Sequence, residues 1–133
     1  MKKISNYLFL GFIFYMIFSL FFKNSAEADP KLSYEDYLAG KAIFIDVREE
    51  DEIRNGMIKG AFWFPLSKIE ENKISVISKI KEVSQGKKIY IYCRSGNRSG
   101  KVKDYLANSN IESINLGGYS TLLEKNLPTQ SRP

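Results

Sequence analysis

The fold is decided by residues 88–100, which read Lys-Ile-Tyr-Ile-Tyr-Cys-Arg-Ser-Gly-Asn-Arg-Ser-Gly. Residues 89–92 alternate Ile and Tyr, a composition typical of a buried strand. The strand ends at Cys93, the single cysteine of the chain, and a loop containing Gly96 follows. Ser99 then begins a pattern with one apolar face, which predicts a helix that buries Val102, Tyr105 and Leu106.

Cys93 is expected to carry a reactive thiolate. A strand that stops at a thiol and turns directly into a helix presents the sulfur to backbone N–H groups and to the positive end of the helix dipole. Arg94 and Arg98 add two permanent positive charges, and such surroundings lower the pKa of a thiol. The alternative is a structural cysteine at a strand end, but that interpretation leaves both arginines and Gly96 unexplained.

Residues 93–99, Cys-Arg-Ser-Gly-Asn-Arg-Ser, resemble the active-site loop of rhodanese-type sulfurtransferases in their small single-domain form. The resemblance implies that Cys93 carries a persulfide between a small anionic donor, such as thiosulfate, and a thiol or cyanide-like acceptor. It also implies that the donor and the sulfur anion are bound by the rest of the loop, namely Arg94, Ser95, Gly96, Asn97, Arg98 and Ser99. We expect an exported member of the family, similar to phage-shock protein E, that uses no cofactor.

A second landmark precedes this loop. Residues 42–45 are continuously apolar, which predicts a strand covered on both faces, and Asp46-Val47-Arg48 follow directly. This triplet resembles a motif that rhodanese domains carry after their second strand, and it assigns supporting roles to Asp46 and Arg48. Two roles stay open for Arg98, substrate contact or a structural pair with Asp46, because a buried arginine usually requires a carboxylate.

One helix is expected before the strand at residues 42–45, and another between this strand and the strand at residues 89–92. Ser33, with an acid three residues later, predicts the start of a helix that ends at Gly40, after a short linker over residues 29–31. Ser67 begins a second capping-box pattern. The apolar stripe that follows predicts core residues, namely Ile74, Val76, Ile77, Ile80 and Val83.

Glycine marks two further turns that resemble rhodanese landmarks. Residues 56–61 contain a glycine turn that leads into a short strand closed by Pro65. Residues 111–116 are a last predicted strand, followed by Gly117-Gly118-Tyr119, a short helix to Lys125 and a polar tail. Rhodaneses commonly carry a tryptophan a few residues later, where this chain has Leu122 or Leu123.

Strands that alternate with helices predict an α/β fold with a mostly parallel central sheet flanked by helices. The resemblance to rhodaneses implies their three-layer arrangement. Sites in such folds lie beyond the carboxyl ends of the strands. Cys93 and Asp46 both lie at a predicted strand end, so the fold and the motif predict the same site.

The first 28 residues differ from the rest of the chain. Two lysines precede an uncharged apolar run over residues 7–22, and Ala26-Glu27-Ala28 follow. This pattern predicts a secretory signal peptide over residues 1–28, cleaved after Ala28, and a rhodanese-like domain over residues 29–133. The domain is then exported, with a periplasmic location expected; an uncleaved membrane anchor is the alternative.

Composition excludes several classes of chemistry. The chain contains no histidine, so neither a Cys–His catalytic pair nor a histidine-based metal site is available. No metal is expected. The formal net charge of +5 is small and its lysines are scattered, which gives no indication of nucleic-acid binding.

Two other functions remain open beside sulfur transfer. Cysteine-type phosphatases resemble this loop but place five residues between cysteine and arginine, whereas four residues separate Cys93 from Arg98. A non-catalytic rhodanese-like module that binds a partner or senses redox state is the second alternative. Such modules often lack the cysteine, which this chain retains.

Overall fold

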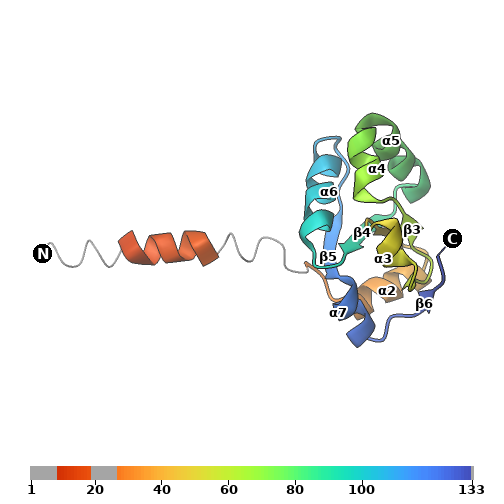
Figure 1. Cartoon of the computed structure of the whole chain (residues 1–133), viewed down its shortest axis with the longest axis horizontal. Helices are drawn as coiled ribbons and strands as arrows, with labels where there is room; N and C mark the ends of the chain where they lie inside the picture. Colours follow the sequence, from red (N-terminus) through yellow and green to blue (C-terminus); the bar gives the residue numbers. More distant parts are fainter. Residues whose placement is uncertain (1–8, 19–26, 133) are drawn as a thin grey trace, which may run out of the picture.

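The computed structural model describes residues 9–18 and 27–132 of the chain. Residues 9–18 are helical, and residues 27–132 fold into an α/β domain (Figure 1). Much of the predicted signal peptide, residues 1–8 and 19–26, lies outside the described residues. Within the described ranges, no helix has both the length and the hydrophobicity needed to cross a bilayer.

A four-stranded sheet forms the centre of the domain. Its strands are β1 (Ala42–Asp46), β3 (Phe62–Trp63), β4 (Lys88–Cys93) and β5 (Ile114–Gly118). They lie in the order β3-β1-β4-β5, and every neighbouring pair is parallel. This arrangement confirms the predicted α/β fold with a parallel central sheet.

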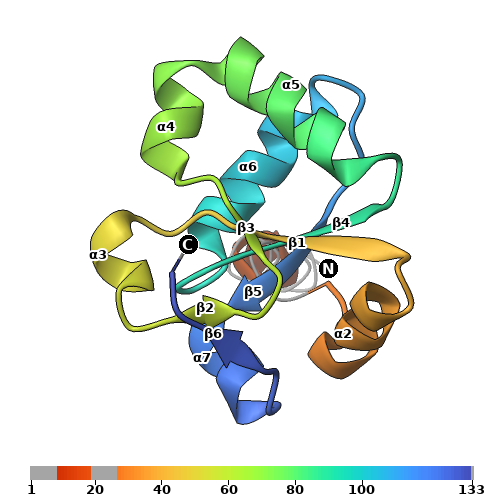
Figure 2. The same ribbon diagram turned by 90° about the vertical axis from the view of Figure 1, so that its right-hand side faces the viewer.

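Helices cover both faces of this sheet, which makes three layers. Figure 2 shows one group of helices on one side, α4 (Leu66–Glu71), α5 (Lys73–Ser84) and α6 (Asn97–Ala107). The other side carries α2 (Pro30–Leu38) and α7 (Tyr119–Glu124). The short helix α3 (Glu50–Ile53) follows β1.

The alternating side chains of β4 divide the core into two halves. Ile89, Ile91 and Cys93 pack with the apolar residues of α4, α5 and α6, whereas Tyr90 and Tyr92 pack in the opposite cluster with residues of β2 (Met57–Ile58) and α7. Each strand residue is covered on its own face because successive side chains of a strand point to opposite sides. Cys93 therefore belongs to the half-core that contains α6.

Three element boundaries differ from the prediction. The first domain helix begins at Pro30 rather than Ser33, because Asp29 caps it through its side chain, so residues 29–31 are no linker. Helix α6 begins at Asn97, two residues before Ser99. The last long strand begins at Ile114 and includes both glycines at its end.

Two predictions for the α4–α5 region are wrong. Ser67 caps no helix, because α4 starts at Leu66; instead its N–H and hydroxyl donate to the Glu49 carboxylate at 3.0 and 2.7 Å. Ile74 is 88% exposed and is no core residue, although Ile77 and Ile80 are buried.

The polar tail forms a short strand that the sequence pattern did not reveal. Strand β6 (Thr129–Gln130) pairs antiparallel with β2. The pairing ties the end of the chain to the turn after α3, and Gln130 Oε1 accepts the Gly60 N–H at 2.9 Å. Leu122, at the position where rhodaneses often carry tryptophan, is buried, whereas Leu123 is exposed.

Candidate functional site

Cys93 lies at the carboxyl end of β4 and is completely buried. The Gly96 N–H donates to Cys93 Sγ at 3.0 Å, and the Ser99 hydroxyl lies 3.4 Å from the same sulfur. The loop therefore curls back on the thiol and directs hydrogen-bond donors at it, as the sequence predicted.

These donors decide the ionisation of the thiol. Burial acts to raise the pKa of Cys93, but hydrogen bonds from the Ser99 hydroxyl and from the backbone N–H groups of Ser99, Ser95 and Gly96 outweigh it, so the pKa lies below its ordinary value. The hydrogen bonds therefore stabilise the thiolate form of Cys93 relative to a cysteine without such donors.

Two glycines make the tight loop possible. Gly96 precedes α6 with a φ of 93°, a left-handed conformation that glycine adopts without steric cost. Gly118 at the end of β5 lies so close to the loop that an added Cβ would sit 2.5 Å from the Arg94 carbonyl oxygen. The adjacent strand is therefore in direct contact with the backbone of the cysteine loop.

The first residues of the loop face solvent. Arg94, Ser95 and Asn97 are exposed, whereas Gly96 and Ser99 are buried. Within the described part of the chain, the Arg94 guanidinium forms no ion pair with a carboxylate. It is available to an anion that approaches this face.

Arg98 binds Glu52, not Asp46. Its two terminal nitrogens donate to the two carboxylate oxygens of Glu52 at 2.7 and 2.6 Å. The hydrogen bond with Glu52 is the main reason that the pKa of Arg98 is raised, and attraction to Cys93 adds to it. The suggested pair with Asp46 is therefore wrong, while proximity to the sulfur leaves a role toward the substrate open.

Asp46 instead holds Arg48, in a pair that is almost wholly buried. Arg48 Nη2 lies 2.8 Å from Asp46 Oδ2, and it also donates to the Gly56 carbonyl oxygen at 2.8 Å. The guanidinium stacks on the Tyr119 ring, 3.8 Å from its centroid. Although burial opposes its charge, the bonds to Asp46 keep the pKa of Arg48 above its ordinary value. The pair joins the end of β1 to the turn at Gly56 and to α7.

Asn115 is a residue of the site that the sequence analysis missed. It lies on β5, is 1% exposed, and donates from Nδ2 to the Gly96 carbonyl oxygen at 2.9 Å. Its Oδ1 accepts from the Ser99 hydroxyl at 2.8 Å and from the Gly117 N–H at 3.0 Å. The available signal was an asparagine near the end of a predicted strand, directly before Leu-Gly-Gly. A polar side chain that a strand buries requires hydrogen-bond partners.

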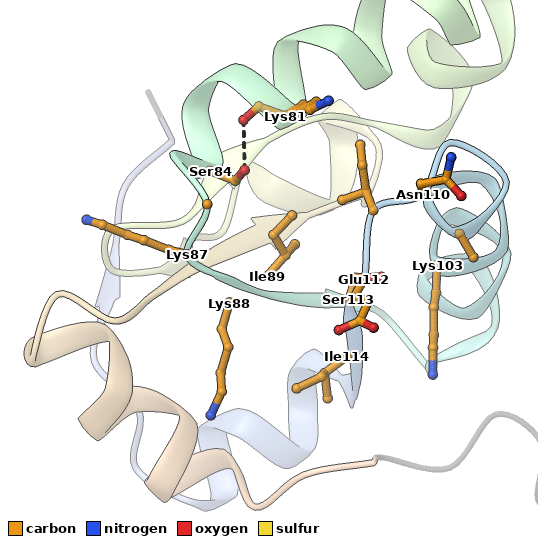
Figure 3. Close-up of a pocket in the computed structure, with 13 residues that line it drawn as sticks. Lys81, Ser84, Lys87, Lys88, Ile89, Lys103, Asn110, Glu112, Ser113 and Ile114 are labelled. Carbon is orange, nitrogen blue, oxygen red and sulfur yellow. Dashed lines mark hydrogen bonds between the residues drawn. The ribbon is translucent and has the colours of Figure 1, made fainter.

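Other features of the described residues add no second centre. They contain no group of three or more His, Cys, Asp or Glu side chains placed to hold a metal ion. A hollow of about 990 Å³ lies at the opposite ends of β4 and β5 from Cys93. Figure 3 shows that the lysines around it, Lys81, Lys87, Lys88 and Lys103, point in different directions rather than at one ligand position.

Comparison with known proteins identifies relatives of the whole domain. The family model "Rhodanese-like domain" matches residues 31–124. The chain is 36% identical over 114 residues to "Uncharacterized protein YqhL" of Bacillus subtilis, covering 84% of this chain and 83% of that protein. It is also 36% identical over 97 residues to "Putative sulfurtransferase YtwF" of the same organism, covering 72% and 77%.

A solved structure has the same fold. The rhodanese-related protein of Thermoplasma volcanium superposes with a TM-score of 0.65 at 23% identity, covering 81% of this chain and all of that one. The suggested similarity to phage-shock protein E in particular stays a prediction.

Proposed function

The chain belongs to the rhodanese-like domain family, and from this premise we propose that it is a sulfurtransferase whose Cys93 carries sulfur as a persulfide. One observation carries the proposal: Cys93 Sγ receives the Gly96 N–H at 3.0 Å, lies 3.4 Å from the Ser99 hydroxyl, and has a lowered pKa. These donors suit a sulfur that is anionic both before and after transfer.

The first half-reaction loads the sulfur. The Cys93 thiolate attacks the outer sulfur of a donor such as thiosulfate, forming a new S–S bond. The S–S bond of the donor breaks, and sulfite leaves with the electron pair of that bond. No proton is transferred, so the absence of histidine is no obstacle.

The second half-reaction restores the enzyme. A thiolate or cyanide attacks the terminal sulfur of the persulfide, and the Cys93 thiolate leaves with the bonding electrons. The charge on sulfur is again met by the loop donors. Exposed Arg94 and Ser95 supply the face at which an anionic donor is received.

The burial of Cys93 sets a condition on this mechanism. Its side chain has no exposed surface, so a donor reaches the sulfur only when the loop opens. The same burial is the observation that favours the alternative, a non-catalytic rhodanese-like module that binds a partner or senses redox state. Sulfur loading separates the two functions.

Intact mass measurement of the purified full chain tests the proposal. Incubation with thiosulfate is expected to add the mass of one sulfur atom, and subsequent cyanide to remove it with release of thiocyanate. The Cys93→Ser variant is the matched control, with unchanged folding and no added sulfur. A folded wild-type protein that gains no sulfur and releases no sulfite would overturn the proposal.

A phosphatase assay addresses the other enzyme class. Four residues between Cys93 and Arg98 form a loop around a single sulfur atom, whereas a phosphoryl group brings three oxygens that each need donors. We expect negligible hydrolysis of aryl phosphates. Efficient hydrolysis by a protein that ignores thiosulfate would assign the site to the phosphatase class instead.

A further inference from the structure

Asn115 bonds to the two residues that direct donors at the sulfur. Its Nδ2 holds the carbonyl oxygen of Gly96, whose own N–H lies 3.0 Å from Cys93 Sγ. Its Oδ1 lies 2.8 Å from the Ser99 hydroxyl, which is itself 3.4 Å from the sulfur. Asn115 therefore acts on the sulfur through two other groups. These are the Gly96 peptide and the Ser99 hydroxyl, which it binds and which lie next to the sulfur.

The register of the sheet places Asn115 on the same side as Cys93. Asn115 pairs with Ile91, whose side chain lies in the same half-core as Cys93. The next residue of β4, Tyr92, pairs with Gly117, so Leu116 is an extra residue on β5. This bulge brings Gly117 and Gly118 opposite Tyr92 and Cys93, next to the cysteine loop.

The Ser99 hydroxyl has one proton and two acceptors. A neutral thiol is a weak acceptor, so the proton goes to Asn115 Oδ1, which is the nearer of the two. A thiolate or persulfide anion is a stronger acceptor, and the hydroxyl can turn toward it. Asn115 Oδ1 then keeps the Gly117 N–H as its partner, so the turn leaves no buried oxygen without a hydrogen bond.

We propose that Asn115 is a positioning residue for the sulfur anion, because it holds the Gly96 peptide against Cys93 and releases the Ser99 hydroxyl to the sulfur when charge develops there. Its importance for turnover rests on the proposed function. Its effect on the ionisation of the thiol does not.

One charged group acts directly on the sulfur, and it is independent of Asn115. Arg98 on α6 interacts electrostatically with Cys93 and is bound to Glu52, with Glu49 acting on it as well. Substitution of the uncharged Asn115 leaves this ion pair in place. A change in thiol ionisation in Asn115 variants is therefore assigned to the hydrogen-bond donors.

The experiment measures the pH at which Cys93 ionises, by the ultraviolet absorbance of its thiolate in the full chain. Cys93 is the single cysteine, so the Cys93→Ser spectrum supplies the background. In Asn115→Ala we expect the midpoint to rise by about one pH unit, a tenfold smaller thiolate fraction at a pH below both midpoints, because the Gly96 peptide is no longer held against the sulfur. The freed Ser99 hydroxyl acts in the opposite direction, and a fall in the midpoint would overturn the inference. Asn115→Ser, which is too short to reach the Gly96 carbonyl, covers the case in which the alanine variant does not fold.

Ser33→Ala is the matched control. Ser33 is equally buried and donates to the Asp29 carbonyl oxygen at 2.8 Å, far along the chain from the loop. We expect it to lower stability without moving the thiol midpoint. An Asn115 variant that loses stability but ionises at the wild-type pH would overturn the inference.

The outcome is separable from that of the proposed function. If the wild type fails to accept sulfur while its thiol midpoint still depends on Asn115, the sulfurtransferase proposal falls and the positioning role stands. If sulfur transfer is observed and the midpoint is independent of Asn115, the positioning role falls and the sulfurtransferase proposal stands.

Discussion

Arg98, in the first turn of the helix that follows the cysteine loop, forms a bidentate ion pair with Glu52, with nitrogen–oxygen distances of 2.7 and 2.6 Å. Glu52 also accepts the Glu49 N–H at 2.8 Å, at the start of α3. The acidic residues after β1 therefore serve as the anchor for the helix that follows the thiol. Both side chains of the pair are about three-quarters buried.

Neutralising Glu52 is expected to weaken this anchor. Glu52→Gln removes the charge that faces Arg98, and we expect a loss of about 1 kcal/mol in the free energy of unfolding at neutral pH. The hydrogen bond from Arg98 lowers the pKa of Glu52. The difference from wild type is therefore fully present above the unfolded pKa of a glutamate and disappears as the pH falls through the lower, folded value.

Urea unfolding at neutral and acidic pH measures this difference. Glu71→Gln is the control, because the pair between Glu71 and Lys68 is highly exposed and is expected to contribute almost nothing. Equal losses for the two variants at neutral pH would contradict the anchoring role of Glu52.

Breaking the buried pair of Asp46 and Arg48 is expected to be much more costly. Asp46→Asn leaves the Arg48 charge buried without its counter-charge, and such losses are on the order of 3–5 kcal/mol. Denaturant unfolding measures the loss. Asp46→Leu combined with Arg48→Met removes both charges and is expected to recover part of the stability; a single variant within about 0.5 kcal/mol of wild type would show that the pair is not structural.

Gly118→Ala tests the contact between β5 and the loop. The new Cβ would lie 2.5 Å from the Arg94 carbonyl oxygen, so the loop backbone has to shift. We expect slower sulfur transfer, by roughly tenfold or more, because donors misplaced by an ångström lose much of their effect. Gly40→Ala is the control: it strains a φ of 72° in open space and is expected to reduce stability but not sulfur transfer.

The start of the domain supplies a further prediction. The Glu27 N–H donates to the Asn115 carbonyl oxygen at 2.8 Å, the Glu27 carboxylate accepts the Asn115 N–H at 3.2 Å, and Lys103 pairs with the same carboxylate. Cleavage after Ala28 would remove these contacts from the open edge of β5. We expect a chain that begins at Asp29 to unfold a few degrees below one that begins at Ser25.

Thermal unfolding of the two chains checks this expectation, and N-terminal sequencing of exported protein identifies the natural start. Equal unfolding temperatures would mean that the Glu27 contacts do not stabilise the domain. A natural start at Asp29 would confirm the predicted processing site, while recovery of the full-length chain in detergent alone would favour an anchor.

The sequence by itself determined the central part of the site. The alternation of Ile and Tyr before Cys93 is a local signal for a buried strand, and Gly96 is a local signal for a tight turn. Both depend on interactions between residues that are neighbours in the chain. The position of the thiol at the carboxyl edge of a parallel sheet followed from these signals.

Only the tertiary structure decided which groups partner one another around that thiol. The sequence suggested Asp46 as a partner of Arg98. In the structure Arg98 pairs with Glu52, 46 residues away, and Asp46 pairs with Arg48, two residues away. Asn115 joins the loop across 16 and 19 residues, at a bulge that shifts the register of β5. Composition and spacing do not encode such contacts, because they depend on how separate strands and helices align when the core packs.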